Sequence, residues 1–158
     1  KVKKQLRLYN NIATYKKEYI ISRNLSREEI LDLHSICDCY IAPSHGEAWS
    51  IPSFEAMAFG NTPICSNHGG PKDFINPDDK NTGTLINGVR KICNHQDSAF
   101  SFLGTGREVW FEPDDVEIIN AMRYYFKNKD NLDKSQGLSQ AKKFDYDTIG
   151  KRMLEYLK

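Results

Sequence analysis

The sequence predicts an α/β fold in which helices cover both faces of an open parallel sheet. Short apolar runs of three to five residues alternate with longer stretches that carry helix start or stop signals. Such alternation favours parallel strands joined by crossover helices, as in Rossmann-like domains. The chain has 158 residues, of which 39% are apolar and 27% charged, which suits a single domain over residues 1–158.

The first predicted elements are a helix, a strand and a second helix. Residues 1–18 are basic and polar with scattered Leu and Tyr, and we expect a helix there that leads into a strand at 19–21. Ser26 is the expected N-cap of a helix within 25–38. Its hydroxyl can accept backbone amides, and Glu29 follows three residues later, as in a capping box.

The middle of the chain holds the clearest strands. The run "CYIAP" at 39–43 is β-branched and aromatic and ends at a proline, as a buried strand would. A helix is expected over 50–59 with Gly60 as its left-handed stop, followed by a strand at 62–66. A glycine turn then opens a short helix near Pro71.

The last part of the chain is expected to add one strand of the sheet and several helices. The apolar run at 82–86 predicts the strand, and the polar, irregular stretch 87–107 is expected to be a loop or insertion. Residues 108–113 form a short extended piece. The next helix, within 114–128, starts with two acidic residues and repeats apolar residues at helical spacing. Two closing helices are expected over 133–143 and 146–157.

Composition excludes some classes of partner. Lys and Arg number 22 against 21 Asp and Glu, so a formal charge of +1 provides no general attraction to nucleic acid, and we expect no nucleic-acid partner. No stretch approaches the roughly 18 apolar residues of a membrane span, so no transmembrane segment is expected. The cysteines lack zinc-ligand spacing and are expected to be reduced, mostly buried thiols of a cytoplasmic protein. They are Cys37, Cys39, Cys65 and Cys93.

The segment "SHGEAWSIPSFEAMAFG", residues 44–60, is the candidate site. Ligands of open parallel sheets bind outside the carboxyl ends of the strands, which is where this segment lies. The amides of Trp49, Ser50 and Ile51 are at the positive end of the predicted helix, where they can hold a diphosphate. Glu55 lies about five residues further on, roughly 7 Å along the helix axis. Its carboxylate can accept two hydrogen bonds from a ribose diol there.

Glu47 precedes the helix and is expected to face the sugar of a sugar nucleotide. A carboxylate there can orient sugar hydroxyls and stabilise a developing oxocarbenium cation. His45 is a further candidate contact for the sugar or its phosphate, and His68 in the turn "SNHGG" is a candidate contact for the sugar or acceptor. The alternatives are that Glu47 only satisfies loop amides, that Glu55 faces solvent and that the histidines have no role.

The segment "PSHGEAWSIPSFEAMAFGNTPICSNHGG" resembles the signature of family 4 glycosyltransferases of the GT-B fold, PSxxEGFGLxxxEAMAxGxPVIxSxxGG. The matching residues are Pro43, Ser44, Glu47, Glu55, Ala56, Met57, Ala58, Gly60, Pro63, Ile64, Ser66, Gly69 and Gly70. The tail "FDYDTIGKRMLEYL" is similar to the closing helix of such proteins. The resemblance implies the donor-binding, C-terminal half of a retaining glycosyltransferase.

In that family the first glutamate contacts the donor sugar, the second the ribose, and the helix amides the diphosphate. The resemblance therefore implies a catalytic role for Glu47 and a ribose contact for Glu55, and it places the nucleobase near Arg23 and Leu25. It implies no metal ion or other cofactor, because helix amides and basic side chains neutralise the phosphates in this fold. The donor would be a nucleoside diphosphate sugar, and the acceptor a hydroxyl of a glycan, lipid or protein.

The sequence also departs from the family pattern. Ala48 and Ser50 replace the usual glycines, and Asp73 stands where the family has Glu. The Gly-rich loop and the Arg and Lys that normally precede this region have no counterpart in 1–18. We expect the acceptor-binding N-terminal domain to lie in a longer protein, peripheral to a membrane or not, and the isolated chain to be inactive. Two alternatives are a catalytically inactive nucleotide-sugar-binding or structural module and a GT-B-like sugar-nucleotide epimerase.

Overall fold

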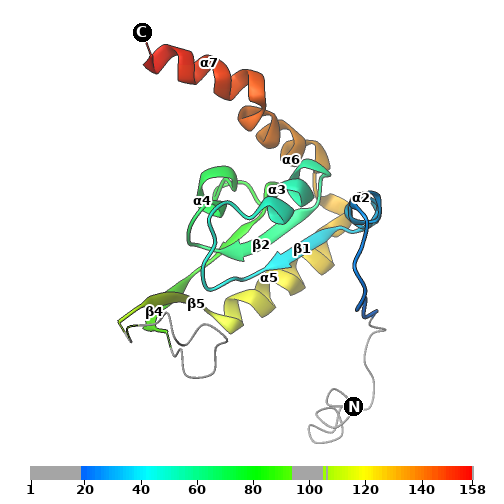
Figure 1. Cartoon of the computed structure of the whole chain (residues 1–158). Helices are drawn as coiled ribbons and strands as arrows, with labels where there is room; N and C mark the ends of the chain where they lie inside the picture. The colour runs from blue at the N-terminus through cyan, green and yellow to red at the C-terminus, as the bar shows by residue number, and fades with distance from the viewer. Residues whose placement is uncertain (1–18, 94–104, 106, 158) are drawn as a thin grey trace, which may run out of the picture.

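A parallel sheet forms the centre of the computed structural model, which describes residues 19–93, 105 and 107–157. Strands β1 (Cys39–Ala42), β2 (Thr62–Ser66) and β3 (Thr84–Ile86) lie in the order β1–β2–β3, and both neighbouring pairs are parallel. Every residue of the central strand β2 is buried. Helices lie on both sides of the sheet (Figure 1), so the predicted Rossmann-like α/β fold class is confirmed.

Local cap signals set the bounds of the first two described helices. Helix α2 (Arg27–Ile36) starts with the predicted capping box: the Glu29 amide donates to Ser26 Oγ at 3.2 Å, and the Ser26 amide donates to the Glu29 carboxylate at 2.9 Å. Helix α3 (Ile51–Ala58) ends before Gly60, whose φ of 80° lies in the left-handed region. The N-cap and the glycine stop are therefore confirmed.

The later helices also follow the sequence pattern. Helix α4 (Pro71–Phe74) begins at the expected proline. At the start of α5 (Asp115–Asn128) the Asp114 carboxylate accepts the amides of Val116 and Glu117 at 2.7 and 3.0 Å. The remaining helical elements are η3 (Lys129–Asn131), α6 (Lys134–Ala141), η4 (Lys142–Phe144) and α7 (Tyr146–Tyr156). Helix α7 projects away from the sheet (Figure 1).

Two apolar clusters form the core, one on each face of the sheet. Residues of β2 alternate between the faces, so neighbouring side chains of this strand belong to different clusters. One cluster consists of Met57, Cys65, Phe74, Ile75 and Ala141. The other consists of Ile64, Ile86 and Tyr125. Helices α3, α4 and α6 thus cover one face, and α5 covers the other.

The prediction of a strand at 19–21 is wrong. Residues 19–22 have no strand assignment, and Ile20 and Ile21 are 75% and 51% exposed. A strand requires a hydrogen-bonded neighbour, and within the described residues β1 pairs only with β2. An apolar run of three residues indicates a tendency to be buried but does not specify a pairing partner. The helix predicted over 1–18 lies outside the described residues.

The prediction that 87–107 forms a loop is wrong for its first part. Strand β4 (Gly88–Ile92) pairs antiparallel with β5 (Val109–Pro113), which occupies the predicted extended piece. Strand β4 is exposed along its whole length, so it lacks the apolar alternation that marks a half-buried strand. Residues 94–104 and 106 lie outside the described residues.

The expectation that the cysteines are mostly buried is also wrong. Only Cys65 is buried; Cys37 is exposed, and Cys39 and Cys93 are intermediate. Cys37 follows the last turn of α2 and lies at the surface, whereas Cys39 starts the edge strand β1 and is half-buried. Burial raises the pKa of the Cys39 and Cys65 thiols to about 11, which keeps both protonated at neutral pH.

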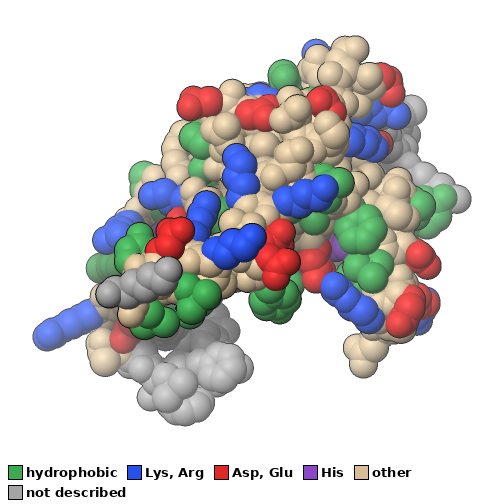
Figure 2. Space-filling view, turned by 90° about the horizontal axis from the view of Figure 1, so that it is seen from above, with side chains coloured by type: hydrophobic (Ala, Val, Ile, Leu, Met, Phe, Trp, Pro, Cys, Tyr) green, Lys and Arg blue, Asp and Glu red, His purple; other side chains and the backbone are tan. Residues whose placement is uncertain are grey.

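The face of the molecule seen from above (Figure 2) carries charges of both signs. On the face seen in Figure 2, Lys and Arg side chains lie among Asp and Glu side chains. This mixture accords with the formal charge of +1.

Candidate functional site

The segment that connects β1 to α3, residues 43–50, is called the site loop here. It begins at the carboxyl end of β1, where the Ser44 amide donates to the Ala42 carbonyl at 2.9 Å. Ser66, the last residue of β2, donates its hydroxyl to the Ser44 carbonyl at 2.6 Å. The loop is therefore fixed to the ends of two neighbouring strands, where ligands of parallel sheets bind.

The glycine turn, residues 67–70, supports the far side of the site loop. The Gly70 amide donates to the Ala48 carbonyl at 2.8 Å. A Cβ atom on Gly69 would lie 2.0 Å from the Glu47 carbonyl oxygen, and one on Gly70 would lie 2.4 Å from that of Ala48. Gly69 also has a φ of 66°. Close backbone approach therefore requires both glycines.

The start of α3 presents unpaired amides. Ser50 is buried, adopts a left-handed conformation with φ 63° and ψ 62°, and exchanges a 2.7 Å hydrogen bond with the Ser53 hydroxyl instead of capping the helix. Among the described residues, the amides of Trp49, Ser50 and Ile51 have no acceptor. These donors at the positive end of α3 can bind an anion.

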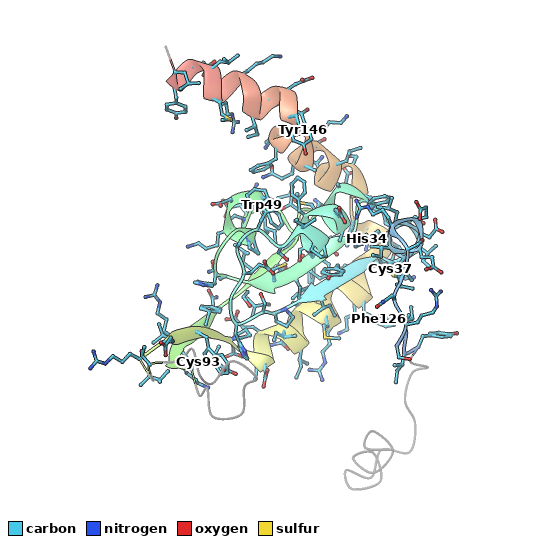
Figure 3. All side chains as sticks on the ribbon, viewed as in Figure 1. His34, Cys37, Trp49, Cys93, Phe126 and Tyr146 are labelled. Carbon is cyan, nitrogen blue, oxygen red and sulfur yellow. The ribbon has the colours of Figure 1, made fainter. Side chains whose placement is uncertain are left out.

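The Trp49 side chain does not belong to the site. Its ring packs among Phe54, Phe74 and Phe144 at centroid distances of 5.7, 5.4 and 5.4 Å. Figure 3 shows Trp49 on the side of the sheet that α4 and α6 cover. At the start of α3, Trp49 therefore contributes its backbone amide and not its ring. Ile51, in contrast, is 62% exposed at the first position of α3.

Glu47 is half-buried within the site loop. Its carboxylate accepts the amide of Ala48 at 3.0 Å. Burial is the main cause that raises the pKa of the Cys65 thiol in β2, and the negative charge of Glu47 raises it further. The carboxylate is thus held against the loop backbone above β2.

Glu55 is paired with a residue that the sequence did not indicate. Arg27 in the first turn of α2 donates from Nη1 to Glu55 Oε2 at 2.7 Å and from Nη2 to Oε1 at 2.5 Å. The Glu55 side chain is only 20% exposed, and the Arg27 hydrogen bonds lower its pKa. The Glu55 carboxylate is therefore partly covered by Arg27 and keeps some contact with solvent. The two residues are 28 positions apart, so no local pattern could identify the pair.

His45 is held by residues of β5. Its ring stacks on Trp110 with centroids 4.1 Å apart and an interplanar angle of 24°. Its Nε2 lies 3.4 Å from a carboxylate oxygen of Glu112, and its carbonyl accepts the Phe111 amide at 2.9 Å. The sequence marked 108–113 only as an extended piece, so Trp110 and Glu112 were missed.

Arg23 and Leu25 lie on the segment that enters α2. Both guanidinium nitrogens of Arg23 donate to the Glu29 carboxylate, at 2.8 and 2.5 Å. The two residues line a cavity of about 220 Å³, and acidic side chains of α2 lie on its wall. In the described part of the chain no hydrogen bond or ion pair joins either residue to the site loop.

Metal-ligating side chains do not gather in the described residues. Nowhere in 19–93 or 107–157 do three His, Cys, Asp or Glu side chains come together in a way that could hold a metal ion. The described helices are also too short or too polar to cross a membrane.

The sequence that carries this site matches a known family of proteins. The family model described as glycosyl transferases group 1 matches residues 1–92, which is more than half of the chain. Comparison with curated proteins gave no match. The matched stretch contains β1, the site loop, α3, β2 and the glycine turn, so the candidate site lies entirely within it. The chain therefore belongs to the group 1 glycosyl transferase family.

Proposed function

We propose that this chain binds the nucleoside diphosphate sugar donor of a glycosyl transfer reaction at the start of α3. The observation that carries the proposal is the set of unpaired amides at residues 49–51, which lies between the two carboxylates Glu47 and Glu55 along the chain. Transfer to an acceptor hydroxyl with retained anomeric configuration is the reaction of the family 4 enzymes that the sequence resembles.

The nucleotide binds on the side of Glu55. Its carboxylate oxygens each have two lone pairs, and the fork of Arg27 uses one on each oxygen. The remaining lone pairs can accept the two hydroxyls of a ribose. Arg27 fixes the orientation of the carboxylate through both hydrogen bonds.

The sugar binds on the side of Glu47. When the bond between the anomeric carbon and the diphosphate oxygen breaks, the electron pair stays on the diphosphate, where the amides of residues 49–51 stabilise the charge. The Glu47 carboxylate stabilises the positive charge that develops on the sugar ring. Because the backbone amides at the start of α3 stabilise the diphosphate charge, the proposal requires no metal ion.

Ser50, which replaces the family's glycine, has a backbone conformation that glycine adopts readily. The family places glycine here, and a left-handed conformation costs a non-glycine residue roughly 1–2 kcal/mol. Ser50 nevertheless has φ 63°, and its side chain is turned into the protein against Ser53. The Ser50 hydroxyl is therefore engaged with Ser53 and does not cap the amides at the start of α3.

Binding of nucleotides by two variants tests the proposal. UDP, GDP, ADP and CDP and the corresponding nucleoside diphosphate sugars are screened on the full-length protein by thermal shift. The affinities of the nucleotide that stabilises the protein most and of its sugar nucleotide are then measured by calorimetry. Glu55→Ala is expected to weaken both nucleotide and nucleotide-sugar binding by about 1.5 to 3 kcal/mol, or roughly 10- to 150-fold, because a charged hydrogen-bond partner is lost. Glu47→Ala should reduce transfer by a similar factor while the nucleotide still binds.

Glu155→Ala is the matched control, since this exposed glutamate of α7 is far along the chain from the site loop. If both site variants bind and transfer like the wild type, the assignment of the two carboxylates is wrong. Product analysis separates the reactions: the epimerase alternative would change the donor sugar without any transfer to an acceptor.

A further inference from the structure

Strand β5 of the β4–β5 hairpin contacts His45 of the site loop. Three adjacent residues of β5 make the contacts: the ring of Trp110, the amide of Phe111 and the carboxylate of Glu112. Trp110 and Glu112 are two positions apart, so both side chains lie on the same face of the strand and meet the imidazole together. His45 is thereby held through its ring and through its backbone.

The opposite face of β5 contacts the glycine turn. Phe111 points to that face, and its ring is nearly parallel to that of His68, at a centroid distance of 5.5 Å and an interplanar angle of 5°. The hairpin therefore contacts both segments that follow β1 and β2. These are the segments that carry Glu47 and the glycines that support it.

The part of the site loop around Gly46 has open space on its side-chain side. Ser66 holds the loop at Ser44, and Gly70 holds it at Ala48. Between these points, a Cβ atom on Gly46 would have no neighbour within 4 Å. Among the described residues, the contacts of β5 with His45 restrain the chain just before Glu47, while the glycine turn supports it at Glu47 and Ala48.

We infer that Trp110 and Glu112 are positioning residues for the sugar end of the site, acting through His45 on the backbone that carries Glu47. The inference rests on the proposed function, because it takes Glu47 as the residue that meets the donor sugar. Arg27 and Glu55, on the nucleotide side, belong to α2 and α3. Within the described part of the chain, no hydrogen bond or ion pair joins either residue to the hairpin. The hairpin should therefore affect recognition of the sugar and leave recognition of the nucleotide unchanged.

The test compares a nucleotide with its sugar nucleotide in full-length protein. UDP with UDP-glucose, or GDP with GDP-mannose, is titrated calorimetrically, and the pair is chosen by which nucleotide the wild type binds. In Trp110→Ala and Glu112→Gln we expect the affinity for the sugar nucleotide to fall about tenfold, which corresponds to one lost contact. The affinity for the nucleotide should stay within about twofold of wild type. Trp110→Phe keeps an aromatic ring against His45 and should restore most of the sugar-nucleotide affinity.

Val109→Ala is the matched control, because Val109 lies on the same strand and is 55% exposed. Equal loss of both affinities in Trp110→Ala and Glu112→Gln would show a merely structural role and overturn the inference, as would wild-type values for both ligands. Glu112→Gln changes a charge without changing size, so the test remains decisive even if Trp110→Ala fails to fold. A wild type that binds no nucleotide would refute the proposed function itself, and this inference with it.

Discussion

Glu55 illustrates how one side chain can join two helices and still present a binding group. Its carboxylate accepts two short hydrogen bonds from Arg27, which link the start of α2 to the middle of α3. A paired carboxylate that keeps free lone pairs is already oriented when a ligand arrives, so less rotational entropy is lost on binding.

The Arg27–Glu55 pair predicts a specific pH dependence. Arg27 lowers the pKa of Glu55 below its ordinary value of 4.5, so the pair contributes stability above that value and loses it as the pH falls through the lower, folded-state pKa. In Arg27→Gln, the Glu55 carboxyl titration followed by NMR should move up toward the ordinary value. The difference in the free energy of unfolding between the wild type and Arg27→Gln should then become smaller below about pH 4.5.

Arg23→Gln serves as the control for this titration. Arg23 pairs with Glu29 instead of Glu55, so its loss should raise the pKa of Glu29 and leave the titration of Glu55 unchanged. A Glu55 titration that is the same in wild type and Arg27→Gln would mean that the pair does not form in solution.

At the scale of elements, features with local signals could be predicted and features with distant partners could not. Ser26 with Glu29 and the stop at Gly60 lie within a few residues of the helix ends they determine, and the structure has both. Strand β4 has no apolar face, and only its pairing with β5 defines it. The strand predicted at 19–21 had a local apolar signal but no partner among the described residues.

The residues of the candidate site also fall into a group with local sequence signals and a group without them. The sequence could indicate Glu47, Glu55 and the helix start from their spacing. Arg27 and Trp110 approach the site only after the chain folds, because each comes from another element. No pattern in their own neighbourhoods distinguishes them from ordinary surface residues. Which side chains assist a site is therefore decided by tertiary packing.

The contact of the glycine turn with the site loop gives a prediction about stability. Gly70→Ala places a Cβ atom 2.4 Å from the Ala48 carbonyl oxygen, so the backbone must shift. Overpacking of this kind typically costs about 1–3 kcal/mol in the free energy of unfolding, measured by urea denaturation. Gly46→Ala has open space around the new atom and should change that free energy by less than about 0.5 kcal/mol. Equal effects of the two substitutions would contradict the close approach.

At the scale of the whole molecule, the buried core and helix α7 are clearly separated. The residues buried to 2% exposure or less belong to the sheet, α3, α4, α5 and the segments between them. Helix α7 has no buried residue and contacts mainly η4. Its large side chains are well exposed, among them Met153 and Leu154 at 60% and 61%. Burial of apolar area, the main source of stability, is therefore concentrated around the sheet.

This distribution predicts that two similar truncations lower the free energy of unfolding by very different amounts. Met57→Ala removes a fully buried side chain from the cluster above β2 and should lower the free energy of unfolding by about 2–5 kcal/mol, through lost transfer energy and the cavity left behind. Leu154→Ala removes a comparable apolar side chain that water already contacts, and the change should stay within about 0.5 kcal/mol. Urea denaturation of both variants and the wild type, monitored by circular dichroism, measures the two differences. A large loss in Leu154→Ala would mean that α7 packs against the rest of the protein in solution, because only a buried leucine can contribute that much.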